Sequence, residues 1–111
     1  MSDETVVIRR REEKHTMKEP GKLYRVAVRS ALMQAITSEA DPHTESRWYQ
    51  HDGEEFHLVL RGEMDYIVGD NTYHLREGDM LWHPSTLRHR SVNTSDAKAV
   101  YLTVGTPPSF Q

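Results

Sequence analysis

The sequence contains no cysteine, and no apolar run in it approaches the ~20 residues that a membrane span needs. Without cysteine, disulfides, thiolate chemistry and zinc-finger frameworks are excluded. The first residues carry no apolar signal region, so the sequence predicts a protein of the cytoplasm that does not enter a membrane. Only 36% of the 111 residues are hydrophobic, which suits β-structure because a strand needs just one apolar face.

The chain also lacks an excess of positive charge. Its formal net charge is -3, which gives no general attraction for polyanions. The one basic run, Arg9 to Arg11, is followed at once by Glu12 and Glu13, which offset most of its charge. We therefore expect no direct binding of nucleic acid by this chain.

Short segments with a period of two dominate the remaining sequence, and no convincing helical stripe is present. Between Leu23 and Arg29, for example, apolar and polar residues alternate, as in a half-buried strand. The pattern predicts an all-β fold of eight to ten short strands, arranged as a sandwich or barrel. We expect an N-terminal arm or edge strand over residues 1–21 and one barrel domain over residues 22–111. The expected strands are 5–8, 23–29, 31–37, 47–50, 55–60, 63–68, 72–75, 80–83, 87–92 and 97–104, with a loop over 38–46.

Histidine is the unusual component, because six of the seven histidines lie between His43 and His89. Glu55 and His57 share one strand face by period two, His51 precedes them across a Gly53 break, and His89 belongs to another strand. Two imidazoles and one carboxylate can cap one face of a metal ion, as in non-haem iron sites. His51, Glu55 and His89 therefore form a candidate site for one divalent transition metal ion, which could be Fe, Mn, Ni or Zn.

Residues 49–93 resemble the two signature motifs of the cupin superfamily. The residues that carry the resemblance are Tyr49, His51, Glu55 and Gly62 in the first motif, and Gly78, Pro84, His89 and Asn93 in the second. The resemblance implies a cupin-type double-stranded β-helix, that is, a jelly-roll barrel, and a homodimer. It also implies metal ligands at His51, Glu55 and His89.

The position of the fourth family ligand is occupied by Tyr49, where the family has histidine. A phenol with an ordinary pKa of about 10 is a poor ligand unless the ion itself deprotonates it. Three alternatives stay open: a site with three ligands, a site in which His57 takes part, and a pocket that holds no metal.

Further residues are expected to face the barrel interior. Tyr49, His57, His83 and Tyr101 are the predicted ligand-binding residues, and Tyr49 and His57 are the candidates for acid or base catalysis. His57 could equally be a packed interior histidine. His74, in a hairpin strand, is expected on the surface.

A narrower resemblance connects the chain to the C-terminal sensor domains of bacterial helix-turn-helix regulators. It depends on the segments 6–10, 51–56, 60–63 and 106–110. This resemblance implies a stand-alone relative or an excised sensor domain. Two functions are weighed: a metal-binding sensor or binding module for a small polar molecule, and a metal-dependent dioxygenase, lyase or isomerase acting on a small organic acid.

Overall fold

The computed structural model describes residues 6–10 and 16–108, and all regular elements in those ranges are β-strands. The predicted all-β fold is confirmed, as is the expected number of strands. The strands are β1 (Thr16–Glu19), β2 (Lys22–Arg29), β3 (Gln34–Ala40), β4 (Thr44–Glu45), β5 (Glu54–Arg61), β6 (Glu63–Val68), β7 (Asn71–Arg76), β8 (Met80–Pro84), β9 (His89–Asn93) and β10 (Ala99–Thr106).

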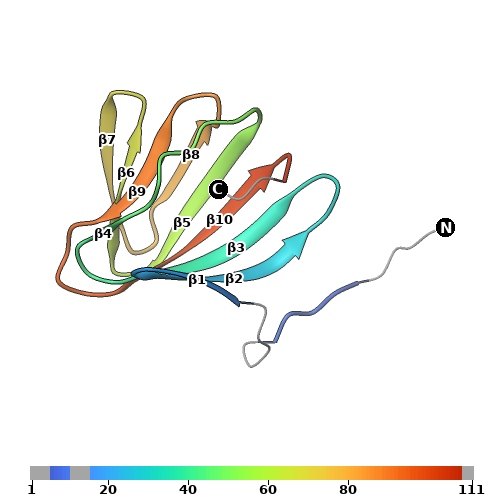
Figure 1. Cartoon of the computed structure of the whole chain (residues 1–111), viewed down its shortest axis with the longest axis horizontal. Helices are drawn as coiled ribbons and strands as arrows, with labels where there is room; N and C mark the ends of the chain where they lie inside the picture. Colours follow the sequence, from blue (N-terminus) through green and yellow to red (C-terminus); the bar gives the residue numbers. More distant parts are fainter. Residues whose placement is uncertain (1–5, 11–15, 109–111) are drawn as a thin grey trace.

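The strands form two antiparallel sheets that face each other, the arrangement of a jelly-roll barrel (Figure 1). The larger sheet has the order β1-β2-β3-β10-β5-β8, and the smaller one has the order β4-β9-β6-β7. Residues 6–10 run beside β2 outside the sheets, where the Arg9 Nε donates to the carbonyl of Ala27 at 3.1 Å. Although β1 lies within residues 1–21, it pairs with β2. The division into arm and barrel domain stays a prediction.

Side-chain alternation fills the space between the sheets. Along β10 the residues Ala99, Tyr101, Thr103 and Gly105 are buried, and the residues between them are partly exposed. The same alternation along β3 and β6 supplies inward apolar side chains from both sheets. The resulting core contains Tyr24, Ile36, Ala40, Val59, Met64, Tyr66, Val68, Leu75, Ala99 and Tyr101.

Three local predictions were wrong. Residues 6–8, the described part of the expected strand 5–8, form no strand. Residues 47–50 form no strand, and only Tyr49 makes a single bridge, to His89. This segment crosses from β4 in the smaller sheet to β5 in the larger one, so it cannot follow a ladder. In addition, β3 continues to Ala40, into the expected loop, because Ser38 and Ala40 are small enough to alternate inward.

Two residues fix the chain at the ends of the strands that carry the site. Gly53 has a φ of 104°, and a Cβ there would lie 1.8 Å from the carbonyl oxygen of Thr106, so only glycine allows this entry into β5. The Asn93 amide donates to the carbonyls of Ala97 and Ala40 at 2.8 and 3.2 Å. Asn93 thus secures the turn after β9 and ties it to the end of β3.

None of the described segments forms a helix with the length and apolarity of a membrane span.

Candidate metal centre

Strand β5 directs two of the predicted site residues into the barrel. Glu55 and His57 are two residues apart, and both are buried, with 2% and 3% of their surface exposed. On the neighbouring strands, His83 of β8 and Gly105 of β10 lie opposite Glu55. Gly105 has no side chain, and a Cβ there would lie 3.5 Å from the Cγ of Glu55, so the Glu55 side chain packs directly over this glycine. His83, expected to point inward, is also buried.

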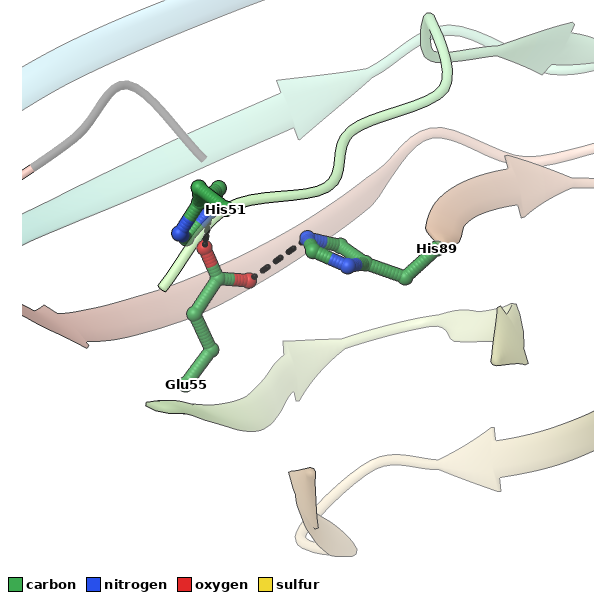
Figure 2. Close-up of side chains that lie close together, drawn as sticks. All are labelled: His51, Glu55 and His89. Carbon is green, nitrogen blue, oxygen red and sulfur yellow. Dashed lines mark hydrogen bonds and ion pairs between the residues drawn. The ribbon is translucent and has the colours of Figure 1, made fainter. Parts of the chain in front are cut away.

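His51 and His89 approach Glu55 from outside the larger sheet (Figure 2). His89 is the first residue of β9, and its backbone exchanges two hydrogen bonds with Tyr49 at 2.8 and 2.9 Å. The backbone N–H of His51 donates to the carbonyl of Ser85 at 3.0 Å. Together these bonds hold the loop that carries His51 against the start of β9 and against the residue that follows β8. His51, Glu55 and His89, here called the candidate triad, therefore point toward one another from three separate segments.

Four imidazoles surround the Glu55 carboxylate. The His51 Nε2 lies 3.1 Å from Oε2 of Glu55. The Nε2 atoms of His57, His83 and His89 lie 3.4, 3.5 and 3.4 Å from Oε1. His57 and His83, here called the buried histidine pair, also bring their Nε2 atoms within 3.0 Å of each other. The structure thus joins the predicted ligands with two further imidazoles.

The opposite ring nitrogens of three of these histidines face backbone carbonyls. The Nδ1 atoms of His51, His83 and His89 lie 3.0, 3.0 and 2.7 Å from the carbonyl oxygens of Asp52, Pro84 and Leu87, respectively. A carbonyl only accepts, so each Nδ1 must carry the proton. In a neutral ring, Nε2 then directs its lone pair toward Glu55, which is the tautomer that a metal ligand requires.

The electrostatics of the cluster favour a cation. Burial alone would raise the pKa of Glu55, but the imidazoles of His57, His83 and His89 beside the carboxylate outweigh burial and hold this pKa well below its ordinary value. Burial lowers the pKa of His57, which opposes its protonation. The Oε1 atom of Glu55 is buried without a hydrogen-bond partner. An ionised carboxylate that faces nitrogen lone pairs is a donor set suited to a transition metal ion.

Two overlapping groups have the spacing for an ion. They are the candidate triad and a second group in which Glu55 joins the buried histidine pair. In each group the ligand atoms lie within 4.8 Å of one another. The residues present therefore fit a metal ion.

The structure directs the Tyr49 hydroxyl elsewhere. It hydrogen-bonds with Tyr24, and burial, followed by the charge of Glu19, raises the pKa of Tyr49. A raised pKa opposes the phenolate form that a metal ligand needs. The ring of Tyr49 stacks on that of His89, with 6.2 Å between centroids. This arrangement gives Tyr49 the geometry of a residue that positions His89.

Tyr101 belongs to a separate polar cluster near the start of β2. Its hydroxyl and the Oγ of Ser91 both accept from Lys22 Nζ, at 2.9 Å each, and they lie 3.2 Å apart. We call these three residues the barrel-base network. Tyr66 lies between this network and the buried histidine pair, with its ring 6.0 Å from that of Tyr101 and 4.5 Å from that of His57.

Sequence reasoning missed Lys22 and Thr103 as interior residues near these clusters. Thr103 Oγ1 lies 2.8 Å from the Nδ1 of His57. The signal was available for Lys22 and Thr103, because each shares its strand parity with an inward tyrosine, Tyr24 or Tyr101. Lysine is usually solvated, so its residue type gives no sign of burial.

Comparisons with known proteins agree with this geometry. The family described as "Cupin domain" matches residues 37–105. An uncharacterized protein of Archaeoglobus fulgidus is 33% identical over 64 residues, covering 58% of this chain and 60% of that relative. The match therefore spans less than two thirds of the relative's length.

Solved structures show the same fold at low identity. KdgF from a Halomonas species has a TM-score of 0.85, with 17% identity, and the match covers 95% of this chain and 96% of that one. An RmlC-like cupin from Shewanella frigidimarina has a TM-score of 0.83, with 16% identity, over 94% and 93% of the two chains. Because the family matches more than half of the residues, the chain belongs to the cupin family.

Proposed function

We propose that the chain is a metal-binding cupin that holds a small polar molecule in its barrel, as a sensor or binding module. In this proposal the candidate triad, His51, Glu55 and His89, binds one divalent transition metal ion. The small molecule then binds at the same interior site, beside the ion.

The buried carboxylate of Glu55 carries the proposal. The Nε2 atoms of His57, His83 and His89 lie 3.4 to 3.5 Å from its Oε1, and this oxygen has no hydrogen-bond partner. A buried carboxylate oxygen without a donor is costly unless a cation lies beside it. A metal ion supplies that positive charge.

The residues of the chain have distinct tasks at this site. The carbonyls of Asp52 and Leu87 hold the rings of His51 and His89 in one tautomer and one orientation. Tyr49 packs against His89 and pairs with its backbone. When bound, the ion would act as a Lewis acid that polarises an oxygen of the small molecule. The buried walls exclude water, which strengthens such contacts.

An enzymatic function is the second candidate, and the placement of His57 favours it. Burial lowers the pKa of His57, which favours the neutral ring that a general base needs, and its Nε2 faces the interior 3.4 Å from Oε1 of Glu55. Tyr49 is the weaker candidate, since Tyr24 engages its hydroxyl. One structure of similar fold is described as a sugar phosphate isomerase of the cupin superfamily, from Silicibacter pomeroyi. It has a TM-score of 0.68 and 22% identity over 80% of this chain and 61% of that one.

Metal analysis followed by a ligand screen tests the proposal. We expect protein purified without chelator to contain a transition metal at close to one ion per chain. In a thermal-shift screen of small acids, amines and sugars, a molecule that raises Tm without being consumed supports a sensor or binding module. Turnover of such a molecule, or oxygen consumption with added Fe(II), supports the enzyme instead. Metal-free protein that resists reconstitution would contradict both.

A homodimer remains a prediction, as do a cytoplasmic location, the kinship with regulators and the lack of nucleic-acid binding. The outer face of β5 and β8 exposes three large apolar side chains, Leu60, Met80 and Trp82. Burial of such a face between two copies would remove apolar surface from water. Sedimentation equilibrium of the native chain and of Trp82→Asp measures whether this face joins two copies.

A further inference from the structure

The buried histidine pair, His57 and His83, has no counterpart in the expected ligand set. Both residues are 3% exposed. Both direct Nε2 at Oε1 of Glu55, and this oxygen has no hydrogen-bond partner. One hydrogen bond of 3.0 Å joins the two Nε2 atoms, so the pair is satisfied within itself and the orphaned atom beside it is Oε1 of Glu55. The arrangement asks for a cation at the point where the three groups meet.

Four distances within the cluster match those between donors around a single ion, and the candidate triad and the pair share Glu55. With metal–ligand bonds of about 2.1 Å, neighbouring donors lie about 3.0 Å apart in an octahedral site and about 3.4 Å apart in a tetrahedral one. The Nε2 atoms of His57 and His83 are 3.0 Å apart. Each lies 3.4 or 3.5 Å from Oε1 of Glu55, and the Nε2 of His89 lies 3.4 Å from the same oxygen. All four separations fall in the range that one ion imposes.

The Nδ1 atoms of His57 and His83 are held by hydrogen bonds, as the outer ring nitrogens of metal-binding histidines are. The carbonyl of Pro84 takes the Nδ1 proton of His83, which leaves the Nε2 lone pair directed inward. The Nδ1 of His57 lies 2.8 Å from Thr103 Oγ1, a hydroxyl that serves as donor or acceptor. Without a metal, the His57 Nε2–H can donate to His83. An ion would displace that single proton and also satisfy Glu55.

We propose that His57 and His83 bind the same ion as the candidate triad. This inference rests on the proposed metal function and enlarges its ligand set to as many as five protein donors, four imidazoles and one carboxylate. The pair thereby supplies the coordination that Tyr49 does not.

Two consequences follow for selectivity and for the bound molecule. A set dominated by imidazole favours Ni, Cu or Zn over Mn and Mg, which prefer oxygen ligands. Five protein donors leave one position free in an octahedral shell. The small molecule therefore binds the ion through one atom, and molecules that need two adjacent positions on the metal, such as chelating 2-oxo acids, are disfavoured.

Metal titration of the full chain tests the pair directly. Metal-free protein is titrated with Ni(II) against a chromophoric chelator, for the native chain and for His57→Ala, His83→Ala and the milder His57→Gln and His83→Asn. We expect each change to weaken Ni(II) binding by at least about 10-fold, the lower bound for losing a group that merely supports a ligand. His74→Ala is the matched control, because this histidine is exposed and distant from Glu55 in the fold. Circular dichroism verifies that each variant is folded.

X-ray absorption of the Ni(II) form of the native chain provides a readout independent of substitution. Imidazole scattering should count four histidines, and a count of two would overturn the proposal. The titrations separate the two hypotheses. If His51→Ala and His89→Ala lose Ni(II) while the variants of the pair bind it as the native chain does, the enlarged set is wrong and the triad stands. If all four variants bind Ni(II) normally, the proposed function fails as well.

Discussion

Two buried polar clusters occupy the same barrel, and they differ in whether their polar atoms have hydrogen-bond partners. In the barrel-base network, a donor meets acceptors, because Lys22 Nζ donates to Ser91 Oγ and to the hydroxyl of Tyr101. In the cluster around Glu55, the buried Oε1 faces three imidazole nitrogens and has no hydrogen-bond partner. Tyr66 separates the two clusters.

The difference indicates which cluster is structural and which one awaits a partner. Buried polar groups that satisfy one another stabilise a unique packing and need nothing further. A buried carboxylate oxygen without a donor is uncommon, and an ion or ligand would complete it. On this ground the proposed metal function belongs to the cluster around Glu55, and we expect a supporting role for the barrel-base network.

Removal of triad ligands should have the largest effect. The double variant His51→Ala/His89→Ala removes two of the imidazoles that face Glu55, and we expect its metal content to fall by more than about 10-fold. Each single variant should also lose metal sharply. Elemental analysis of protein purified without chelator measures this. His74→Ala should keep the native content, and equal metal content in all of these proteins would rule out the triad.

The second-largest effect is expected from removal of the metal, which should lower the stability of the fold. An ion that binds only the folded chain adds about 2.7 kcal/mol to the free energy of unfolding when its free concentration is 100 times Kd. We therefore expect treatment with a chelator to lower Tm, and added Ni(II) or Zn(II) to restore it. Tyr101→Phe should show the same metal-dependent increment as the native chain. An increment that survives in His51→Ala/His89→Ala would place the ion elsewhere.

The barrel-base network should affect stability alone. Tyr101→Phe deletes one of the two acceptors of Lys22 and leaves part of a buried ammonium without a partner, at a cost of about 1–3 kcal/mol. Denaturant unfolding measures this loss, and metal content should not change. Tyr101 was predicted from the sequence to bind the ligand. If Tyr101→Phe keeps its stability but loses affinity for a small molecule found in the screen, that prediction is right and the division between the clusters is wrong.

The fold and the convergence of the triad were predictable because they depend on local patterns. Period-two alternation places Glu55 and His57 on one face, and the spacing to His89 follows the cupin motifs. A sequence does not reveal which strands become neighbours, so the contact between Glu55 and His83 across β5 and β8 could not be derived. Parity alone predicted that His83 points inward and said nothing of what it meets.

For Tyr49 the motif predicted the position of the residue but not the direction of its side chain. The motif placed it at a ligand position, and its backbone does pair with His89. The direction of its hydroxyl depends on Tyr24 of β2, a residue distant in sequence. Side-chain hydrogen bonds between distant strands are set by tertiary packing, which the motif does not contain.

The smallest effect is expected at His74, where a histidine and a carboxylate also meet, but in water. The hydrogen bond with Asp65, 2.5 Å long, raises the pKa of His74. Because the folded pKa lies above the unfolded value of about 6.5, this stabilisation is complete below that value and is lost as pH rises through the raised pKa. His74→Ala should therefore lower the free energy of unfolding at about pH 5 by no more than about 0.5 kcal/mol, since solvent screens an exposed pair.

Well above the raised pKa, the variant and the native chain should unfold alike. Unfolding curves at the two pH values measure the difference, and an equal loss at both would mean that packing, and not charge, stabilises this contact. At His74 water supplies the hydrogen bonds that Asp65 does not. The same residue types need an ion around Glu55 because burial withholds that water.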